Sequence, residues 1–149
     1  DGIRDVAGCL VGSDMCIRDS INTADQALRM IDEIDQPNVV VHLDTYQMNI
    51  EEEDYRKPVL AVGDLLGYVH ISESHRGYLG TGTVDFDTFF ATLREIGYAG
   101  PIVFESFSSK VVSPALSNTL GIWREHWQDG MDLAKHARSF MRERLTDGG

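Results

Sequence analysis

The sequence predicts an α/β fold in which helices cover a parallel sheet. The prediction rests on an alternation of helical and strand-like patterns along the chain, and on three short β-branched apolar runs that are typical of strands buried on both faces. At 149 residues the chain can bury a substantial core, but it is shorter than the roughly 250 residues of a complete (β/α)₈ barrel. A doubly wound sheet and part of such a barrel therefore both fit the pattern.

The first expected elements are a helix and a strand. Thr23 and Gln26 have the spacing of a capping box, and apolar residues then recur at three- and four-residue intervals, which predicts a helix over 24–34. The β-branched run at 39–44 predicts a strand that ends at an aspartate. The acidic stretch 45–54 is expected to be a loop.

A second helix and a second strand are expected next. Pro58 suits a first helical turn, and the apolar spacing after it predicts a helix up to Gly67. The run 68–72 predicts a strand, and a glycine-rich loop over 77–82 follows it. Because no G-x-G-x-x-G pattern follows a strand, a dinucleotide-binding Rossmann fold is disfavoured.

The C-terminal part continues the alternation. Asp85 is a candidate N-cap for a helix over 86–96, and residues 101–105 predict a third strand. A long loop then leads to a helical region around 116–123 and to a final helix over 130–145. Three aromatic residues of this part are expected to pack between helices, namely Trp123, Trp127 and Phe140.

Composition disfavours several classes of function. Thirteen basic and 24 acidic residues leave a formal charge of 13 − 24 = −11, which opposes the phosphate neutralisation that nucleic-acid binding requires. No apolar run approaches the roughly 20 residues needed to cross a bilayer, and no secretory signal begins the chain. We therefore expect a cytoplasmic protein with neither nucleic-acid nor membrane partners. Cys9 and Cys16 have neither metal-site spacing nor the density of a disulfide scaffold.

Each of the three expected strands has a candidate metal ligand at or near its C-terminal end. These residues are Asp44, His70 and Glu105. Taken singly, each has an ordinary structural explanation: a helix cap, a core histidine and a surface ion pair, respectively. Because the carboxyl ends of parallel strands lie at one edge of a sheet, three such residues at equivalent points predict a shared site. Two carboxylates and an imidazole suit Mn²⁺, Mg²⁺ or Co²⁺ better than a structural zinc.

Other polar residues near the strand ends are weaker candidates. Arg76 follows the second strand and is either a group that holds substrate hydroxyls or a developing oxyanion, or a solvated loop charge. His42 and His75 are expected to be structural or exposed. The acidic cluster 51–54 is expected to be a solvated helix start.

Three stretches of the chain carry a family resemblance. They read LDTYQMNIEE at 43–52, VHISESHRG at 69–77 and VFESF at 103–107. They resemble the C-terminal half of the ketose 3-epimerases, the D-tagatose and D-psicose (D-allulose) 3-epimerase group of the xylose isomerase-like barrels. The separations of 26 residues from Asp44 to His70 and of 35 from His70 to Glu105 agree with the family pattern, and the resemblance runs from about Ile21 to Leu145.

The resemblance implies the C-terminal half of a (β/α)₈ TIM barrel, and hence an incomplete barrel. It also implies that Asp44, His70 and Glu105 are ligands of a catalytic divalent ion, with Mn²⁺ expected first and Co²⁺ or Mg²⁺ as alternatives. Arg76 matches the substrate-binding arginine of the family, and Glu105 matches one of its two acid/base glutamates. The intact parent would be a carbohydrate epimerase with a small-molecule ketose substrate, and a homodimer or homotetramer.

The chain departs from the family pattern in its first part. The family has two glutamates in the strand before the first helix, and the matching places hold Val11 and Ile17. Gln47 stands where the family has a substrate-binding histidine, and it still offers hydrogen bonds to a hydroxyl. Residues 1–20 are expected to be a non-native leader or a remnant of the preceding strand, and residues 21–149 the C-terminal half of the barrel.

Three hypotheses follow from these residues. In the first, the parent removes the C3 proton of a ketohexose and returns it to the opposite face through a cis-enediolate, with the metal polarising the carbonyl and Glu105 as one acid/base group. In the second, the reaction is that of another sugar isomerase or of an inosose dehydratase of the same superfamily. In the third, the chain is a non-catalytic metal-binding fragment. Because one of the two acid/base glutamates is missing, the chain alone is expected to be inactive.

Overall fold

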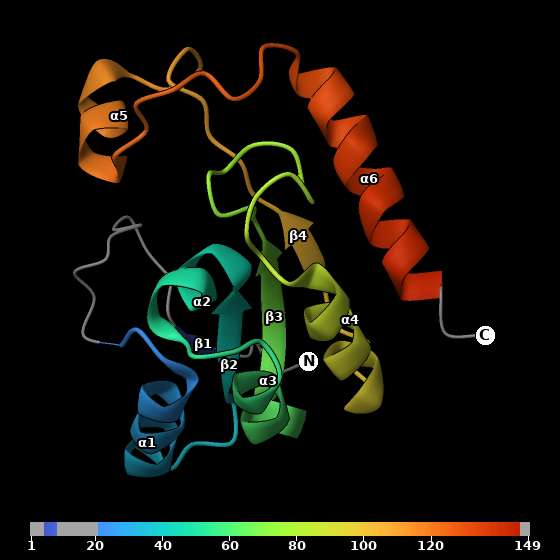
Figure 1. Ribbon diagram of the computed structural model, residues 1–149. Coiled ribbons are helices and arrows are strands. Elements are labelled where there is room, and N and C mark those ends of the chain that lie inside the picture. Colours follow the sequence, from blue (N-terminus) through green and yellow to red (C-terminus); the bar gives the residue numbers. More distant parts are fainter. Residues whose placement is uncertain (1–4, 9–20, 147–149) are drawn as a thin grey trace.

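The computed structural model describes residues 5–8 and 21–146, which form a parallel sheet with helices packed around it (Figure 1). The elements are β1 (Asp5–Gly8), α1 (Ala24–Ile34), β2 (Val39–Asp44), α2 (Thr45–Glu51), α3 (Lys57–Val62), the 3₁₀ helix η1 (Gly63–Leu65), β3 (Leu66–Ile71), α4 (Phe86–Glu95), β4 (Ile102–Phe104), α5 (Pro114–Leu120) and α6 (Gly130–Thr146).

The strands lie in the order β1-β2-β3-β4, and all three pairings are parallel. Each strand therefore pairs with the next one along the chain, as in consecutive β/α units. The register places Asp44 opposite His70, and His70 opposite Val103, two residues before Glu105. The carboxyl ends of β2, β3 and β4 consequently meet at one edge of the sheet, as the sequence predicts.

One face of the sheet forms the hydrophobic core with α1, α3 and α4. Residues such as Val41 and Leu43 on β2 are fully buried in this core. Because side chains alternate along a strand, the neighbouring positions lie on the other face. There the rings of His42, Tyr68 and His70 pack edge to face.

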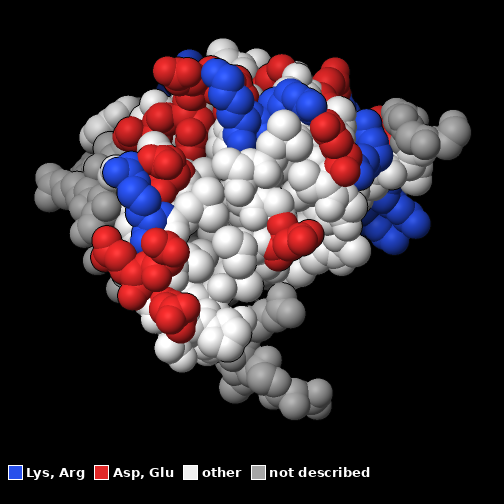
Figure 2. Space-filling model, turned by 90° about the horizontal axis from the view of Figure 1, so that it is seen from below, with Lys and Arg blue, Asp and Glu red and all other residues white. Residues whose placement is uncertain are grey.

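The charge of the chain is unevenly spread. Figure 2 views the molecule from below, and acidic side chains gather toward the left of that view while acidic and basic ones alternate toward its right. The face seen there has no uniformly basic area. In the described ranges, no helix has both the length and the apolar character that a membrane span requires.

Most of the expected elements are confirmed. Helix α1 and strand β2 have the predicted bounds, and α4 and α6 differ from the prediction by one residue at the C-terminal end. The capping box forms, since the Thr23 hydroxyl accepts from the Gln26 amide and the Gln26 side chain accepts from the Thr23 amide. Phe140 packs on Phe86 with 5.1 Å between ring centroids, so its expected role in helix packing is also confirmed.

The loop expected over 45–54 is wrong in its first part, because residues 45–51 form helix α2. Asp44 starts this helix: its side chain accepts a hydrogen bond from the Tyr46 amide, as an N-cap does. The acidic cluster 51–54 is not one solvated helix start either. Glu52 is half-buried and accepts from the Ala24 amide, whereas Asp54 caps the start of α3 through the amides of Arg56 and Lys57.

The helix expected from Pro58 to Gly67 is shorter than predicted. It ends at Val62 because Gly63 adopts φ 49° and ψ −125°, a conformation that interrupts the helix and that glycine reaches without a Cβ penalty. The chain then makes the short 3₁₀ turn and enters β3 at Leu66, two residues earlier than the predicted strand.

Three further features differ from the sequence analysis. Strand β1 was not predicted as a separate element, and it pairs in parallel with β2. Trp123 is 74% exposed and lies after the end of α5, so its predicted packing role is wrong. Trp127 lies in the loop before α6 rather than on a helix. The positions Cys9, Val11, Cys16 and Ile17 lie outside the described residues, so the predictions about them stay predictions.

Candidate metal centre at the carboxyl ends of the strands

The three predicted ligands come together at the end of the sheet. Asp44, His70 and Glu105 each offer one ligand atom, and these atoms all lie within 4.8 Å of one another. His70 Nδ1 is 3.7 Å from Asp44 Oδ2 and 3.8 Å from Glu105 Oε1. These separations are too long for hydrogen bonds and fit donors that are arranged around a common centre.

Buried hydroxyl groups hold the strand ends in this arrangement. Thr45 Oγ1 donates to the Ser72 carbonyl at 2.7 Å and accepts from the Ser72 amide at 2.8 Å. Ser72 Oγ in turn donates to the Glu105 carbonyl at 2.8 Å. The ends of β2, β3 and β4 are therefore bonded to one another directly behind the three ligands. Thr45 and Ser72 are not among the predicted site residues, although Thr45 immediately follows the first predicted strand and Ser72 is the last residue of the second.

The pKa values of two ligands are shifted by their surroundings. Burial on its own lowers the pKa of the His70 imidazole, but the carboxylates of Asp44 and Glu105 favour the imidazolium and raise that pKa above its ordinary value. Burial and the negative charge of Asp44 raise the pKa of Glu105, and the positive charges of Arg76 and His70 offset only part of this effect. The site thus concentrates negative charge in a poorly hydrated place, where a cation is favoured.

The donor atoms fit a divalent cation. Asp44 Oδ2 and His70 Nδ1 are buried and have no hydrogen-bond partner among the described residues. Buried polar atoms normally have a hydrogen-bond partner. The lack of one for these two atoms, which face each other and the Glu105 carboxylate, therefore needs an explanation. A shared cation accounts for both, and two carboxylates with one imidazole suit Mn²⁺, Co²⁺ or Mg²⁺.

Arg76 is part of this centre rather than a solvated loop charge. Its side chain is buried, and its Nη1 donates to Glu105 Oε2 at 3.1 Å. The guanidinium lies over the Tyr46 ring, 3.9 Å from the centroid, and 4.9 Å from the centroid of Phe107. The guanidinium of Arg76 therefore contacts both aromatic rings as well as Glu105.

The remaining candidates lie around the centre. Gln47 is buried on the first turn of α2, three residues after Asp44, and whether it contacts substrate stays a prediction. His42 is buried and packs edge-on against His70, with 4.3 Å between centroids, and does not belong to the ligand group. His75 stacks on His126 and its Nδ1 accepts from the Gly77 amide, which fits the structural role expected for it.

Comparison with known proteins shows which family the chain resembles. Residues 10–144 match the family model described as xylose isomerase-like TIM barrel. The chain is 60% identical over 126 residues to a ketose 3-epimerase of Arthrobacter globiformis, and 60% identical over 124 residues to an L-ribulose 3-epimerase of Methylomonas sp.. A crystal structure of a D-allulose 3-epimerase from Methylomonas sp. superimposes with a TM-score of 0.81 at 60% identity, covering 84% of this chain and 44% of that one.

The matches cover most of this chain but less than half of each relative. They include 85% of this chain and 44% of the Arthrobacter protein, and 83% of this chain and 43% of the Methylomonas protein. The chain therefore spans less than half the length of the curated relatives it matches, as expected for part of a barrel.

Proposed function

The chain belongs to the xylose isomerase-like TIM barrel family, and we propose that the protein it represents is a metal-dependent ketose 3-epimerase. The observation that carries the proposal is the convergence of Asp44, His70 and Glu105 on one point beside Arg76. It is supported by relatives that are named as ketose and L-ribulose 3-epimerases. The substrate would be a small ketose, and the family resemblance implies a homodimer or homotetramer for the intact protein.

The three ligands would hold the divalent cation, with Mn²⁺ expected first and Co²⁺ or Mg²⁺ as alternatives. When bound, such a cation polarises a ketose carbonyl and makes the neighbouring C3–H acidic. Asp44 Oδ2 and His70 Nδ1 have no hydrogen-bond partner among the described residues, so these two atoms are available to the cation. Glu105 differs because it also bonds to Arg76.

Glu105 is the acid/base group of the proposed reaction. Without metal, burial and the charge of Asp44 raise the pKa of Glu105, and a carboxylate beside the sugar can take up and return a proton. Glu105 would remove or return the C3 proton on one face of the sugar. The Arg76 guanidinium, next to that carboxylate, would stabilise the oxygen that becomes negative in the enediolate. Inversion at C3 requires a second acid/base group on the opposite face.

A chimera tests the proposal. Residues 21–146 of this chain replace the matching part of the Arthrobacter ketose 3-epimerase, which is 60% identical over the aligned region and supplies the rest of a barrel. With Mn²⁺ present, we expect the chimera to interconvert ketoses that differ at C3, such as fructose and psicose. Chromatography of the sugars measures this conversion.

The matched control is Glu105→Gln in the same chimera. Glutamine keeps the size of the side chain but cannot exchange a proton at this position, so epimerisation is expected to disappear. A folded chimera that binds Mn²⁺ and converts no ketose would contradict the proposal. Conversion of an aldose, or dehydration of an inosose, in place of 3-epimerisation would assign the site to another reaction of the same superfamily.

A further inference from the structure

A buried carboxylate lies behind Arg76 and takes no part in the proposed chemistry. Glu73 is 0% exposed. Its Oε1 accepts hydrogen bonds from the amides of Ser74 at 2.8 Å and Val84 at 3.3 Å, and its Oε2 accepts from the amide of Gly80 at 2.8 Å. The two ends of the loop between β3 and α4 are thus fastened to one side chain.

The same residue also holds the backbone of Arg76. The Glu73 carbonyl accepts from the Arg76 amide at 2.8 Å, and Arg76 adopts a positive φ of 60°. Such a conformation is unfavourable for a residue with a Cβ, so the loop must be fastened on both sides to keep it. On its other side, the Arg76 carbonyl accepts from the Phe107 amide at 3.3 Å and from the Ser106 hydroxyl.

The contacts of Glu73 fit a side chain that accepts hydrogen bonds at both of its oxygens. No lysine, arginine or histidine forms an ion pair with it in the part of the chain that the structure describes. Burying a carboxyl group without hydrogen-bond partners is costly, and three backbone amides supply these partners. A carboxylate has two acceptor oxygens and no donor, whereas a glutamine would turn an NH₂ group toward one of these amides.

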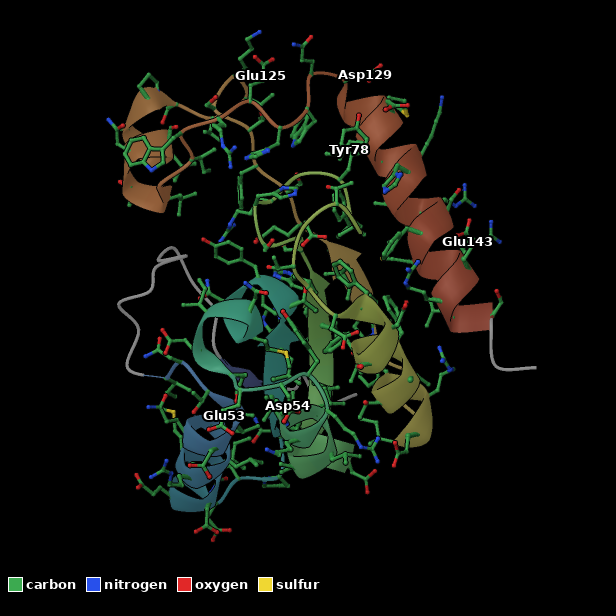
Figure 3. All side chains as sticks on the ribbon, viewed as in Figure 1. Glu53, Asp54, Tyr78, Glu125, Asp129 and Glu143 are labelled. Atoms are coloured by element: carbon green, nitrogen blue, oxygen red, sulfur yellow. The ribbon has the colours of Figure 1, made fainter. Side chains whose placement is uncertain are left out.

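The loop passes close to the Glu73 carboxylate at Gly82, where only a residue without a side chain fits. A Cβ placed on Gly82 would lie 2.4 Å from Glu73 Oε1 and 2.3 Å from Ser74 Oγ. The far part of the loop is anchored to α6, because Tyr78 donates to Asp132 Oδ2 at 2.6 Å, and the labelled Tyr78 points toward the start of that helix in Figure 3. The loop is therefore fastened to Glu73 near both of its ends and to α6 in its middle part.

We propose that Glu73 is the positioning residue of Arg76: its buried carboxylate closes the loop so that the guanidinium meets Glu105 between Tyr46 and Phe107. The inference rests on the proposed function, because positioning matters only if Arg76 acts on substrate. The hydrogen bonds of the Glu73 side chain go to backbone amides of the loop, so its proposed action is through Arg76.

A double-mutant cycle in the chimera tests this assignment. Glu73→Gln is expected to lower kcat by roughly 10- to 100-fold, the cost of a displaced catalytic group, with Mn²⁺ affinity unchanged. In an Arg76→Ala background the same substitution is expected to lower kcat by less than about twofold, because the group that it positions is already gone. An equal loss in both backgrounds, or no loss in either, would overturn the proposal.

Two controls separate positioning from general damage. Glu52→Gln changes a half-buried carboxylate that, like Glu73, accepts from a backbone amide, that of Ala24 at 2.7 Å, and it is expected to leave kcat unchanged. The Arg76 side-chain Nε–H signal in an arginine-labelled NMR spectrum gives a readout without substrate. In the parent chimera and in Glu52→Gln, the Arg76 signal should be sharp, with a chemical shift that differs from that of solvent-exposed arginines. In Glu73→Gln, it should move to the chemical shift of solvent-exposed arginines.

The spectrum also distinguishes failure of the proposed function from failure of the positioning role of Glu73. An inactive chimera whose Arg76 signal still depends on Glu73 would refute the proposed function and leave the positioning role standing. An active chimera whose Arg76 signal is the same with glutamate or glutamine at position 73 would refute the positioning role and leave the proposed function standing.

Discussion

Asp44 uses its two carboxylate oxygens for different purposes. Oδ1 accepts from the Tyr46 amide at 2.7 Å and caps α2, whereas Oδ2 faces His70 and has no hydrogen-bond partner in the described residues. Asparagine is as good an N-cap as aspartate but removes the charge. Asp44→Asn is therefore expected to weaken Mn²⁺ binding by at least about tenfold, a change of about 1.4 kcal/mol, while α2 stays folded.

Titration calorimetry measures the Mn²⁺ affinity of Asp44→Asn, and thermal unfolding without metal measures the stability of the variant. Without the ion, the unfolding midpoint of Asp44→Asn should equal or exceed that of the parent, because a buried negative charge beside Glu105 is removed. Unchanged Mn²⁺ affinity in Asp44→Asn would show that the cation does not use Oδ2.

Metal binding should depend on pH through two of the ligands. His70 and Glu105 must both be deprotonated to bind a cation, and the pKa of each lies above its ordinary value in the absence of metal. Mn²⁺ affinity is therefore expected to be full in mildly alkaline solution, to begin to fall above pH 6.5 as His70 takes up a proton, and to fall again at lower pH as Glu105 does. Calorimetry between pH 8 and pH 5 measures the Mn²⁺ affinity. An affinity that is constant over this range would contradict the assignment of His70 and Glu105 as ligands.

The ligands could be found from sequence, but the groups that orient them could not. Asp44, His70 and Glu105 each end a recognisable strand, so the topology alone brings them together. The bond between Thr45 and Ser72 joins residues that are 27 positions apart, and Glu73 bonds to amides up to 11 positions away. These partners become visible only when the loop geometry is known.

At the scale of elements, Gly63 decides where α3 ends and β3 begins. Its φ of 49° and ψ of −125° are open to glycine and strained for alanine, although an added Cβ would meet nothing within 4 Å. Gly63→Ala is therefore expected to lower the free energy of unfolding by about 1–3 kcal/mol from backbone strain alone. Urea unfolding of the chimera measures this change.

Gly130→Ala is the matched control. Gly130 begins α6 without a positive φ, and an added Cβ would make only an ordinary contact with Trp127 at 3.5 Å. Alanine favours helix over glycine, so this substitution should leave stability unchanged or raise it slightly. A loss at Gly130 as large as the loss at Gly63 would show that the cost at Gly63 does not come from its conformation.

The elements that sequence reasoning found are those with a strong local pattern. Helix α1 has a capping box and a regular apolar repeat, and β2 is a continuous β-branched run. Helix α2 has seven residues of mixed polarity, and it forms because Asp44 caps it and because Thr45, Gln47 and Met48 are buried against the strand ends. The formation of α2 therefore depends on tertiary contacts rather than on local helix propensity.

At the scale of the whole molecule, the sheet has open edges. Four parallel strands are half of those that close a (β/α)₈ barrel, and among the described residues β1 and β4 each pair with one strand only. Val103 on β4 is 38% exposed. Unpaired edges with apolar side chains favour association, so the 149-residue chain is expected to self-associate and to unfold without a sharp transition.

Light scattering after size-exclusion chromatography measures the association. Val103→Lys places a charge on the open edge strand and should raise the monomer fraction, whereas Val111→Lys changes a more exposed valine in the loop after β4 and should not. A monodisperse monomer of the unmodified chain with a sharp cooperative melt would contradict the half-barrel interpretation.

Net epimerisation by the 149-residue chain is expected to be undetectable. Inversion at C3 needs proton removal on one face of the sugar and delivery on the other, and a single carboxylate such as Glu105 cannot reach both. Val11 and Ile17 stand where the family resemblance places two further glutamates. With Mn²⁺ supplied, exchange of the C3 proton with solvent deuterium is expected to persist at a low rate and to vanish in Glu105→Gln. Conversion of fructose to psicose, or of tagatose to sorbose, is expected to stay below detection. Clear conversion by the chain alone would show that a second acid/base group lies among its own residues.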